Sequence, residues 1–270
     1  MASCPLCEST DFTLSHLGPT RIQKCSNCHL WFIPAPEIEG NYDKTYYAAT
    51  RADNHDLNAL RTTQYEIDAR HLHRHIQSGN LIDAGCSIGA FIDALDAVGR
   101  YTLLGIDPDL SAIEVARKRT GSSHISFECC DCMSLEPRQE ADALIFRGSF
   151  QFLGANLAKT LARVKTLLKK GGLLFIYVLP NSDSFVFRLL GEKWSLFDPV
   201  YHRLIFNSKS IEQMCRLFDF EIVELSYPYL ETVYADIEKD YNSVIGLVRG
   251  EGHSSPPFWG NIIQLVLRNR

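Results

Sequence analysis

The feature that most constrains the fold is a regular alternation of short apolar runs with helical segments between residues 80 and 180. We predict strands in the apolar runs at residues 81–86, 102–106, 125–129, 143–146 and 173–179. Helical periodicity predicts helices at residues 88–98, 111–119 and 156–170. Near-continuous apolar strands separated by helices indicate a parallel sheet that is covered on both faces. The middle of the chain is therefore predicted to be an α/β domain.

Two helix boundaries carry sharper signals, and the end of the chain departs from the alternation. Ser111 is predicted to cap the helix that follows it, with Glu114 as its capping-box partner. Gly171 and Gly172 are predicted to end the helix before them. Beyond this point we expect a helix at 208–218, a partial helix within 232–248, and strands at 221–226 and 261–267. No long helix directly precedes the last strand, which is therefore expected to enter the sheet antiparallel.

Composition and charge exclude several classes of protein. The chain has 270 residues, 46% of them hydrophobic, with 27 Lys+Arg against 32 Asp+Glu and a net charge of -5. This length suits one large domain with a small appendage, and the apolar fraction argues against disorder. The longest clean apolar run, residues 173–179, is far shorter than the roughly 20 residues of a membrane span. The acidic balance argues against binding to nucleic acid. The odd count of nine cysteines argues against a disulfide scaffold, so we expect a cytoplasmic protein with reduced thiols.

Four of the cysteines form a metal-binding pattern at the start of the chain. The spacing is Cys-x2-Cys, 17 residues, then Cys-x2-Cys, which is typical of a zinc ribbon. Two such turns can place four sulfurs around one ion, and four protein ligands leave no open position for catalysis. The segment between the pairs is too short for a core of its own, so the metal must supply much of its folding free energy. We predict structural Zn²⁺ on Cys4, Cys7, Cys25 and Cys28; the alternative is a pair of redox dithiols.

A polar helix is predicted from residue 53 to residue 77, after a proline-bounded apolar run and a tyrosine cluster. His71 and His75 are four residues apart on this helix, a spacing that can bind a metal ion. We interpret them as part of a solvated helix face, because we expect no acidic third ligand beside them.

The first strand of the alternating region leads into a glycine loop, Asp83-Ala84-Gly85-Cys86-Ser87-Ile88-Gly89. A loop without bulky side chains lets the backbone approach a ligand, and a helix amino end offers free N–H groups. Asp107 lies at the tip of the second strand, where an acid can accept hydrogen bonds from both hydroxyls of a ribose. Asp131 follows the third strand, within reach of an adenine amino group. Together these residues predict an adenosine-containing ligand, although alone Asp107 would be a turn residue before Pro108 and Asp131 a helix cap.

With these motifs the chain resembles the class I S-adenosylmethionine (SAM)-dependent methyltransferases, in the bacterial branch that carries an amino-terminal zinc ribbon and methylates glycans or secondary metabolites. The resemblance rests on the ribbon, the glycine loop, residues 105–109, the run KKGGLLFIYVLP, the insertion PNSDSFVFRLLGEKWSLFDPVYHRLIF and the closing strand. It implies a Rossmann-like, seven-stranded, mostly parallel sheet with an antiparallel last strand. It also implies SAM as methyl donor and S-adenosylhomocysteine (SAH) as product. The cofactor-binding residues are then Asp83, Gly85, Cys86, Ser87, Gly89, Asp107, Pro108, Asp131, Cys132 and Arg147.

The chain departs from the family where the catalytic base is expected. Many relatives carry a Glu-His pair after the fourth strand, and the equivalent positions here are Gln151 and Phe152, neither of which can take a proton. A hydroxyl nucleophile needs a base at neutral pH. In the first of three readings the insertion supplies the base through His202, oriented by Asp198, and we take His202 as the catalytic candidate. The other readings are an acceptor acidic enough to need no base, and a site that has lost activity.

The sequence predicts three parts: a zinc ribbon at 1–40, a helical connector at 41–78 and a SAM-binding domain at 79–270, with substrate-facing insertions at 181–206 and 230–257. Trp194 and Phe197 in the first insertion are either a substrate lid or hydrophobic cover. We expect a methyltransferase acting on a small-molecule acceptor, most simply on oxygen. The alternatives are an RNA base methyltransferase and a non-catalytic SAM- and zinc-binding module that docks a carrier or pathway protein.

Overall fold

The computed structural model describes residues 3–17, 20–34, 55–136, 139–191, 194, 196, 202–249 and 258–270. Several residues singled out in the sequence lie outside this part of the chain: the tyrosine cluster at 42–47, Phe197, Asp198 and the loop at 250–257.

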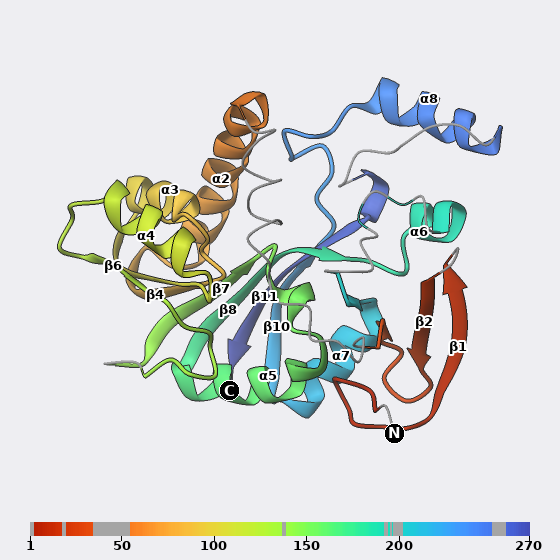
Figure 1. Ribbon diagram of the computed structural model, residues 1–270, viewed down its shortest axis with the longest axis horizontal. Coiled ribbons are helices and arrows are strands. Elements are labelled where there is room, and N and C mark those ends of the chain that lie inside the picture. The colour runs from red at the N-terminus through yellow and green to blue at the C-terminus, as the bar shows by residue number, and fades with distance from the viewer. Residues whose placement is uncertain are drawn as a thin grey trace.

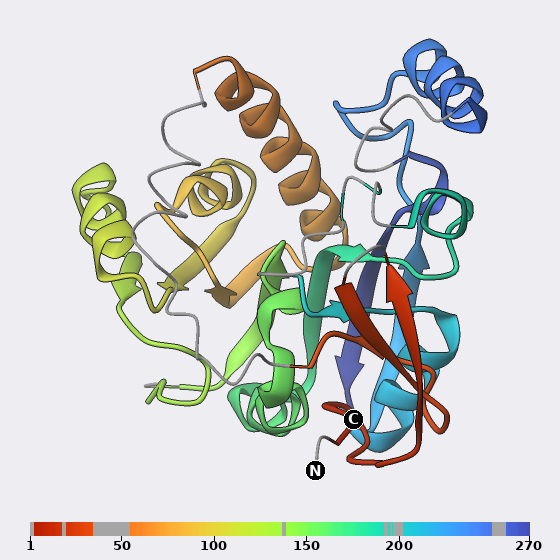
Figure 2. The same ribbon diagram turned by 45° about the vertical axis from the view of Figure 1, so that its right-hand side comes forward.

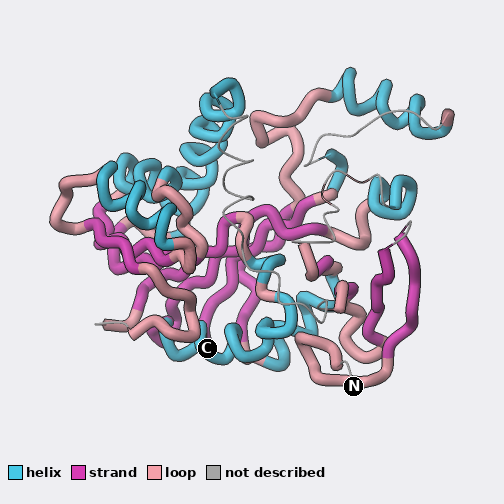
Figure 3. The backbone as a smooth tube through the Cα atoms, in the orientation of Figure 1, coloured by secondary structure: helices cyan, strands magenta, loops and turns pink. Residues whose placement is uncertain are grey.

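A seven-stranded sheet forms the centre of the molecule (Figures 1 and 3). Its order is β10-β11-β8-β7-β4-β5-β6, and neighbouring strands from β8 to β6 are parallel. The strand β11 is antiparallel to both β8 and β10, which confirms the predicted fold class. The strands are β4 (Ser78–Ala84), β5 (Arg100–Ile106), β6 (Ile125–Glu128), β7 (Ala141–Arg147), β8 (Leu168–Pro180), β10 (Phe220–Ser226) and β11 (Ile262–Asn269).

Helices cover both faces of this sheet, as the near-continuous apolar strands require (Figure 1). One buried cluster joins the sheet to α2 (His55–His75), α3 (Ala90–Val98) and α4 (Leu110–Arg119). A second cluster on the other face joins it to α5 (Leu157–Leu167) and α7 (Ser208–Leu217). The other helical elements of the described residues are α6 (Phe185–Leu190), α8 (Ile237–Val248), and the short 3-10 turns η1 (Phe150–Phe152), η2 (Gly154–Asn156) and η4 (Phe258–Gly260). No helix in the described ranges is both long and apolar enough to cross a membrane.

The cysteine-rich segment is built into the main domain. Its hairpin of β1 (Phe12–Leu17) and β2 (Thr20–Cys25) continues through β3 (Trp31–Phe32) to β9 (Leu204–Ile205), giving a four-stranded sheet. The β3–β9 pairing is antiparallel, and Figure 2 shows the hairpin in red on the side of the molecule that carries α7. Cys4, Leu6 and Cys28 are buried in the same cluster as the apolar face of α5. The segment therefore shares its core with the sheet instead of extending from it as a tail.

Two of the predicted helix boundaries are wrong. The helix α5 ends at Leu167, and Gly171 and Gly172 lie inside β8, because Leu168 already pairs with Ala141 before a register shift in the β7–β8 ladder. The cap of α4 is Asp109, whose carboxylate Oδ1 accepts hydrogen bonds from the Ser111 backbone N–H at 2.8 Å and hydroxyl at 2.7 Å. Ser111 is thus the capped residue and not the cap.

Candidate cofactor and active site

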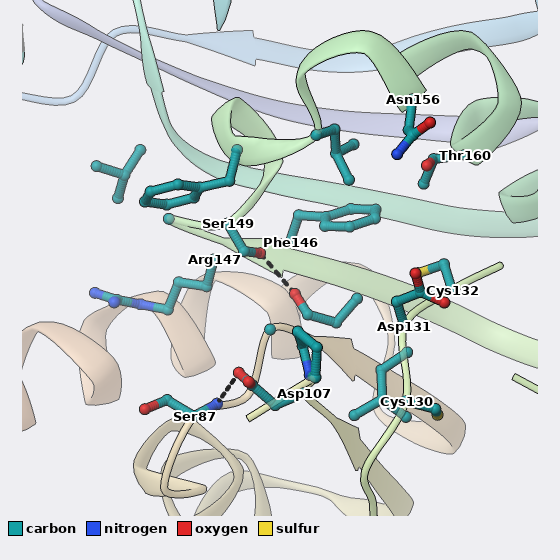
Figure 4. A pocket seen from close by; sticks show the side chains of 18 of the residues that line it. Ser87, Asp107, Cys130, Asp131, Cys132, Phe146, Arg147, Ser149, Asn156 and Thr160 are labelled. Carbon is teal, nitrogen blue, oxygen red and sulfur yellow. Dashed lines mark hydrogen bonds between the residues drawn. The ribbon is translucent and has the colours of Figure 1, made fainter. Parts of the chain in front are cut away.

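A cavity of about 540 Å³ opens at the carboxyl ends of β4, β5 and β7. In an open α/β sheet ligands bind at this edge, where the strand order reverses on either side of the first strand. Figure 4 shows the side chains that converge there from these strands and from the loops after them. Of the predicted cofactor residues, seven line the cavity: Gly85, Ser87, Asp107, Pro108, Asp131, Cys132 and Arg147. The other three, Asp83, Cys86 and Gly89, are not among its lining residues.

The glycine loop lies tightly against the ends of its neighbouring strands. Gly85 has a φ of +87°, and its N–H donates to the Ile106 carbonyl at 2.8 Å. A Cβ atom on Gly85 would lie 2.5 Å from the Cβ of Ser149, whose hydroxyl donates to the Ala84 carbonyl at 2.6 Å. Only glycine therefore fits this position, and no side chain at residue 85 enters the cavity.

Asp107 is held as a buried carboxylate at the cavity wall. Its Oδ2 accepts the Ser87 N–H at 2.9 Å (Figure 4). Its Oδ1 accepts the Asp109 N–H at 2.9 Å. Both carboxylate oxygens therefore accept backbone N–H groups, which fixes the orientation of the side chain at the cavity wall. The ribose role of Asp107 stays a prediction.

Asp131 also faces the cavity, and it caps a turn as well. Its Oδ1 accepts hydrogen bonds from the Ser134 N–H at 2.9 Å and hydroxyl at 2.6 Å. Burial raises the pKa of Asp131, but the hydrogen bonds from Ser134 outweigh burial and hold the pKa below its usual range. The side chain is therefore an ionised acceptor that caps a turn and not a helix, and its contact with an adenine amino group stays a prediction.

Two predicted residues lie behind the cavity wall. Asp83 is buried, and its Oδ1 has no hydrogen-bond partner in the described structure. Burial raises the pKa of Asp83 to about 7, although the Arg147 charge opposes this shift. Cys86 is buried as well, and burial raises the pKa of its thiol well above the usual range. Cys86 is therefore a neutral packing residue, and its contribution to the site is its backbone.

The helix α2 supplies part of the site that sequence reasoning missed. Arg61 and Tyr65 line the cavity, and the Arg147 guanidinium lies 4.1 Å from the centre of the Tyr65 ring. Arg147 also donates from Nε to Asp68 Oδ2 at 2.8 Å. The signal was present in the sequence, because residues 61, 65 and 68 have the spacing of a single helix face. It was overlooked because the helix was interpreted as solvated.

The positions of the family's Glu-His pair are filled by side chains without acid–base capacity. Gln151 is buried and its Nε2 donates to the Gly148 carbonyl at 3.0 Å. Phe152 lines the cavity, and its ring centre lies 5.2 Å from that of His202. His202 Nδ1 lies 2.8 Å from the Leu196 carbonyl, which can only accept, so Nδ1 carries a hydrogen. His202 is not a lining residue, so one aromatic ring separates it from the cavity.

The predicted zinc ligands converge. Cys4 Sγ lies 3.4 Å from Cys28 Sγ, and Cys7 Sγ lies 3.6 Å from Cys25 Sγ. Sulfurs bound at about 2.3 Å to a tetrahedral zinc ion are about 3.8 Å apart, so the set fits this metal. All four cysteines are free thiols, and the Cys28 N–H points at Cys25 Sγ at 3.5 Å, as in a metal-binding knuckle.

Trp194 belongs to the core and not to a lid. Its side chain is only 1% exposed, and its ring lies 5.2 Å from that of Phe187 in a T-shaped contact. Of the two readings made from the sequence, hydrophobic cover describes it.

The comparison with protein families settles the class of the chain. The family model described as "Methyltransferase domain" matches residues 60–225. The chain belongs to this family. Its structure and family make it a SAM-dependent methyltransferase with the class I fold. The predicted family resemblance is thereby confirmed.

Solved structures share the fold at low sequence identity. A chain of the complex between the Haloferax volcanii Trm112 methyltransferase activator and its methyltransferase is 16% identical with a TM-score of 0.63, over 82% of this chain and 96% of that one. The N-methyltransferase NodS from Bradyrhizobium japonicum WM9, bound to SAH, is 18% identical with a TM-score of 0.56, over 84% and 99%. The Burkholderia thailandensis 1,6-didemethyltoxoflavin-N1-methyltransferase, bound to 1,6-didemethyltoxoflavin and SAH, is 16% identical with a TM-score of 0.53, over 90% and 96%.

A curated relative matches over a shorter segment. The ribosomal protein L11 methyltransferase of Pseudomonas syringae pv. tomato is 29% identical over 127 residues, which is 46% of this chain and 42% of that protein. The match thus spans less than half the length of the relative.

Proposed function

We propose that this protein transfers a methyl group from SAM to a small molecule, most simply to an oxygen atom. One observation carries the proposal: the cavity that holds Asp107 is also lined by the aromatic rings of Tyr65, Phe146, Phe152 and Tyr234. An aromatic wall beside a few polar groups suits a planar or ring-shaped acceptor. The volume of about 540 Å³ is in the range of small-molecule sites.

The cofactor role of the chain is divided among its strand ends. Asp107 would accept hydrogen bonds from the two ribose hydroxyls, and Asp131 would accept one from the adenine amino group. The backbone around Gly85 and Ser87 would face the methionine end of SAM. When bound, SAM supplies an electrophilic methyl group on a sulfonium. The protein then has to hold the acceptor in line with that methyl group, and such positioning can account for several kcal/mol of the barrier.

His202 is the proposed base. Its Nδ1–H bond to the Leu196 carbonyl fixes the tautomer in which Nε2 can accept a proton. Its contact with Phe152 places the imidazole directly behind the cavity wall. The competing reading, an acceptor acidic enough to react without a base, is favoured by the same Phe152 ring, because it separates His202 from the cavity.

The net charge of the chain and the names of similar proteins rank the possible methyl acceptors. The net charge of -5 gives no electrostatic support for RNA binding. Two of the structures with the same fold are named as N-methyltransferases, one of them with a bound small-molecule acceptor, so nitrogen is the first alternative to oxygen. The ribosomal protein L11 methyltransferase makes a protein acceptor the second.

The zinc ribbon at 1–40 is proposed to bind structural Zn²⁺ through Cys4, Cys7, Cys25 and Cys28, ahead of a connector at 41–78 and a catalytic domain at 79–270. The convergence of the four sulfurs supports the metal. The insertions at 181–206 and 230–257 are proposed to select the acceptor, since Tyr234 lines the cavity.

The proposal is tested with SAM labelled at its methyl group and a panel of phenols, carboxylic acids, sugars and amines, with ribosomal RNA and ribosomal proteins as competing acceptors. Label transferred to a hydroxyl compound, and lost with Asp107→Ala, is the expected result. Label found only on RNA or protein would overturn the small-molecule proposal. Label transferred to an amine would support the small-molecule acceptor but would show that nitrogen, and not oxygen, is methylated.

A further inference from the structure

A second group of potential metal ligands lies where the end of α2 meets β10. His71 Nε2 lies 3.0 Å from Glu224 Oε1, and His75 Nε2 lies 3.0 Å from Glu224 Oε2. The expectation that no acidic ligand is near these histidines is wrong, because the fold brings β10 beside the helix. None of the three residues lines the cofactor cavity. The cluster is therefore separate from the proposed active site.

The hydrogen bonds around a neutral His71 leave no hydrogen between its Nε2 atom and the Glu224 carboxylate. The Tyr177 hydroxyl lies 3.2 Å from the Asp68 carbonyl and 3.0 Å from His71 Nδ1. A carbonyl only accepts, so for both contacts to be hydrogen bonds the hydroxyl donates to Asp68 and accepts from Nδ1–H. In a neutral imidazole this leaves a lone pair on Nε2, facing the Glu224 carboxylate. The contact then needs a cation between the two atoms, either a proton or a metal ion.

The spacing of the three side chains suits a metal ion. One ligand atom from each of His71, His75 and Glu224 lies within 4.8 Å of the others. Ligands at about 2.0–2.1 Å from a tetrahedral zinc ion are about 3.3 Å apart, close to the observed 3.0 Å contacts. Histidines four residues apart on a helix present their rings on one face, and a two-histidine, one-carboxylate set is a known zinc combination.

The surroundings resemble those of a supported metal site. A ligating histidine normally donates its other N–H to a neighbour, as His71 Nδ1 does to Tyr177. A ligating carboxylate is normally hydrogen-bonded in turn, and the Ser226 hydroxyl lies 3.3 Å from Glu224 Oε1. The Phe175 ring packs edge-on against both imidazoles and forms an apolar wall.

We propose that His71, His75 and Glu224 bind one divalent transition-metal ion of the zinc type, with water as the fourth ligand. The ion would fasten the carboxyl end of α2 to β10. Because the same helix carries Arg61 and Tyr65 into the cofactor cavity, the site would hold in place a helix that completes the cavity. This inference goes beyond methyl transfer and does not depend on it.

The test measures zinc per chain in the full-length protein, together with Glu224→Gln, His75→Gln and the control His73→Gln. His73 lies on the same helix but contacts the Tyr101 hydroxyl at 2.9 Å instead of Glu224. We expect wild type and His73→Gln to hold one zinc ion more per chain than the other two variants. Circular dichroism verifies that each variant is folded.

Cobalt separates this site from the cysteine ligands in the wild-type chain itself. Cobalt bound by thiolates has strong near-ultraviolet charge-transfer absorption, whereas a histidine–carboxylate site does not. We expect titration with Co²⁺ to continue in the visible region for one further equivalent after the thiolate bands are complete. If wild type and Glu224→Gln bind equal zinc, and no cobalt is taken up beyond the thiolate site at micromolar metal, the proposal is overturned and the cluster is a metal-free hydrogen-bond network.

Discussion

At the scale of single residues, the site depends on carboxylates whose surroundings set their charge. Asp107 and Asp131 are stabilised as acceptors by backbone and serine hydrogen bonds. Asp83, in β4 at the start of the glycine loop, has a side-chain oxygen without a hydrogen-bond partner in the described structure and a pKa raised by burial to about 7. The sequence placed all three at strand ends, but only the structure distinguishes the two that face the cavity from the one behind it.

The raised pKa of Asp83 predicts a pH-dependent stability. Between about pH 4 and pH 7 the native state keeps a proton that the unfolded chain has released, so the free energy of unfolding falls as pH rises through this window. The effect is at most about 4 kcal/mol. Asp83→Asn removes it. Urea denaturation should show that the free energy of unfolding of the variant, relative to that of wild type, is higher at pH 8 than at pH 5. The same difference between the two proteins at both pH values would contradict a raised pKa of Asp83.

His202 has a prediction of its own. His202→Asn should leave SAH affinity unchanged, because the imidazole lies outside the cavity lining, but should lower kcat by about 100-fold, the lower end of a general-base effect. The control is His124→Gln, whose imidazole pairs with Asp96 on the surface. Turnover is measured with the best acceptor from the labelled panel. Wild-type turnover in His202→Asn would point to an acceptor that is acidic enough to react without a base.

At the scale of elements, the ribbon and the domain share a sheet. Trp31 pairs with Ile205 and Phe32 with Leu204, and the Asn207 side-chain amide donates to the His29 carbonyl at 2.8 Å. The ribbon therefore supports the strand that begins just after His202. The predicted zinc ligand Cys28 is thus connected to the segment around His202, the proposed base, through the β2–β3 and β3–β9 pairings.

Loss of a zinc ligand should consequently be felt beyond the ribbon. Cys28→Ser is expected to release zinc and to speed amide hydrogen exchange at Leu204 and Ile205 as well as in β1 and β2. Cys129→Ser, at an exposed cysteine, is the control and should change neither. If amide hydrogen exchange becomes faster only within residues 4–32, the prediction is contradicted, because β9 is then stable without the zinc-bound ribbon.

The elements also show where sequence reasoning succeeds and fails. The strands of the seven-stranded sheet, their order of appearance and the antiparallel last strand follow from the apolar runs and from the lack of a long helical pattern directly before the last strand. The end of α5 was misplaced because Gly171 and Gly172 suit both a helix stop and a strand irregularity. The histidine pair on α2 was misread because its carboxylate partner, Glu224, is about 150 residues away and meets the helix only through the sheet.

At the scale of the whole molecule, one sheet edge gathers residues from β4, β5, β7 and the loops after them. The parallel order of the strands made this convergence predictable, since consecutive strand ends meet at one edge. The contribution of α2 was not predictable in the same way, because nothing in its local sequence specifies which face of the sheet it covers. The family match and the fold agree on SAM as the cofactor.

The central claim is that this edge binds the cofactor through Asp107. The most direct measurement is calorimetric titration with SAH of wild type, Asp107→Ala, Asp107→Asn and the control Asp93→Ala, an exposed acid on α3 that pairs with Arg119. We predict micromolar binding by wild type and the control, weakened at least tenfold, about 1.4 kcal/mol, by both Asp107 substitutions. Equal SAH affinity in all four folded proteins, or no binding by wild type, would contradict the account.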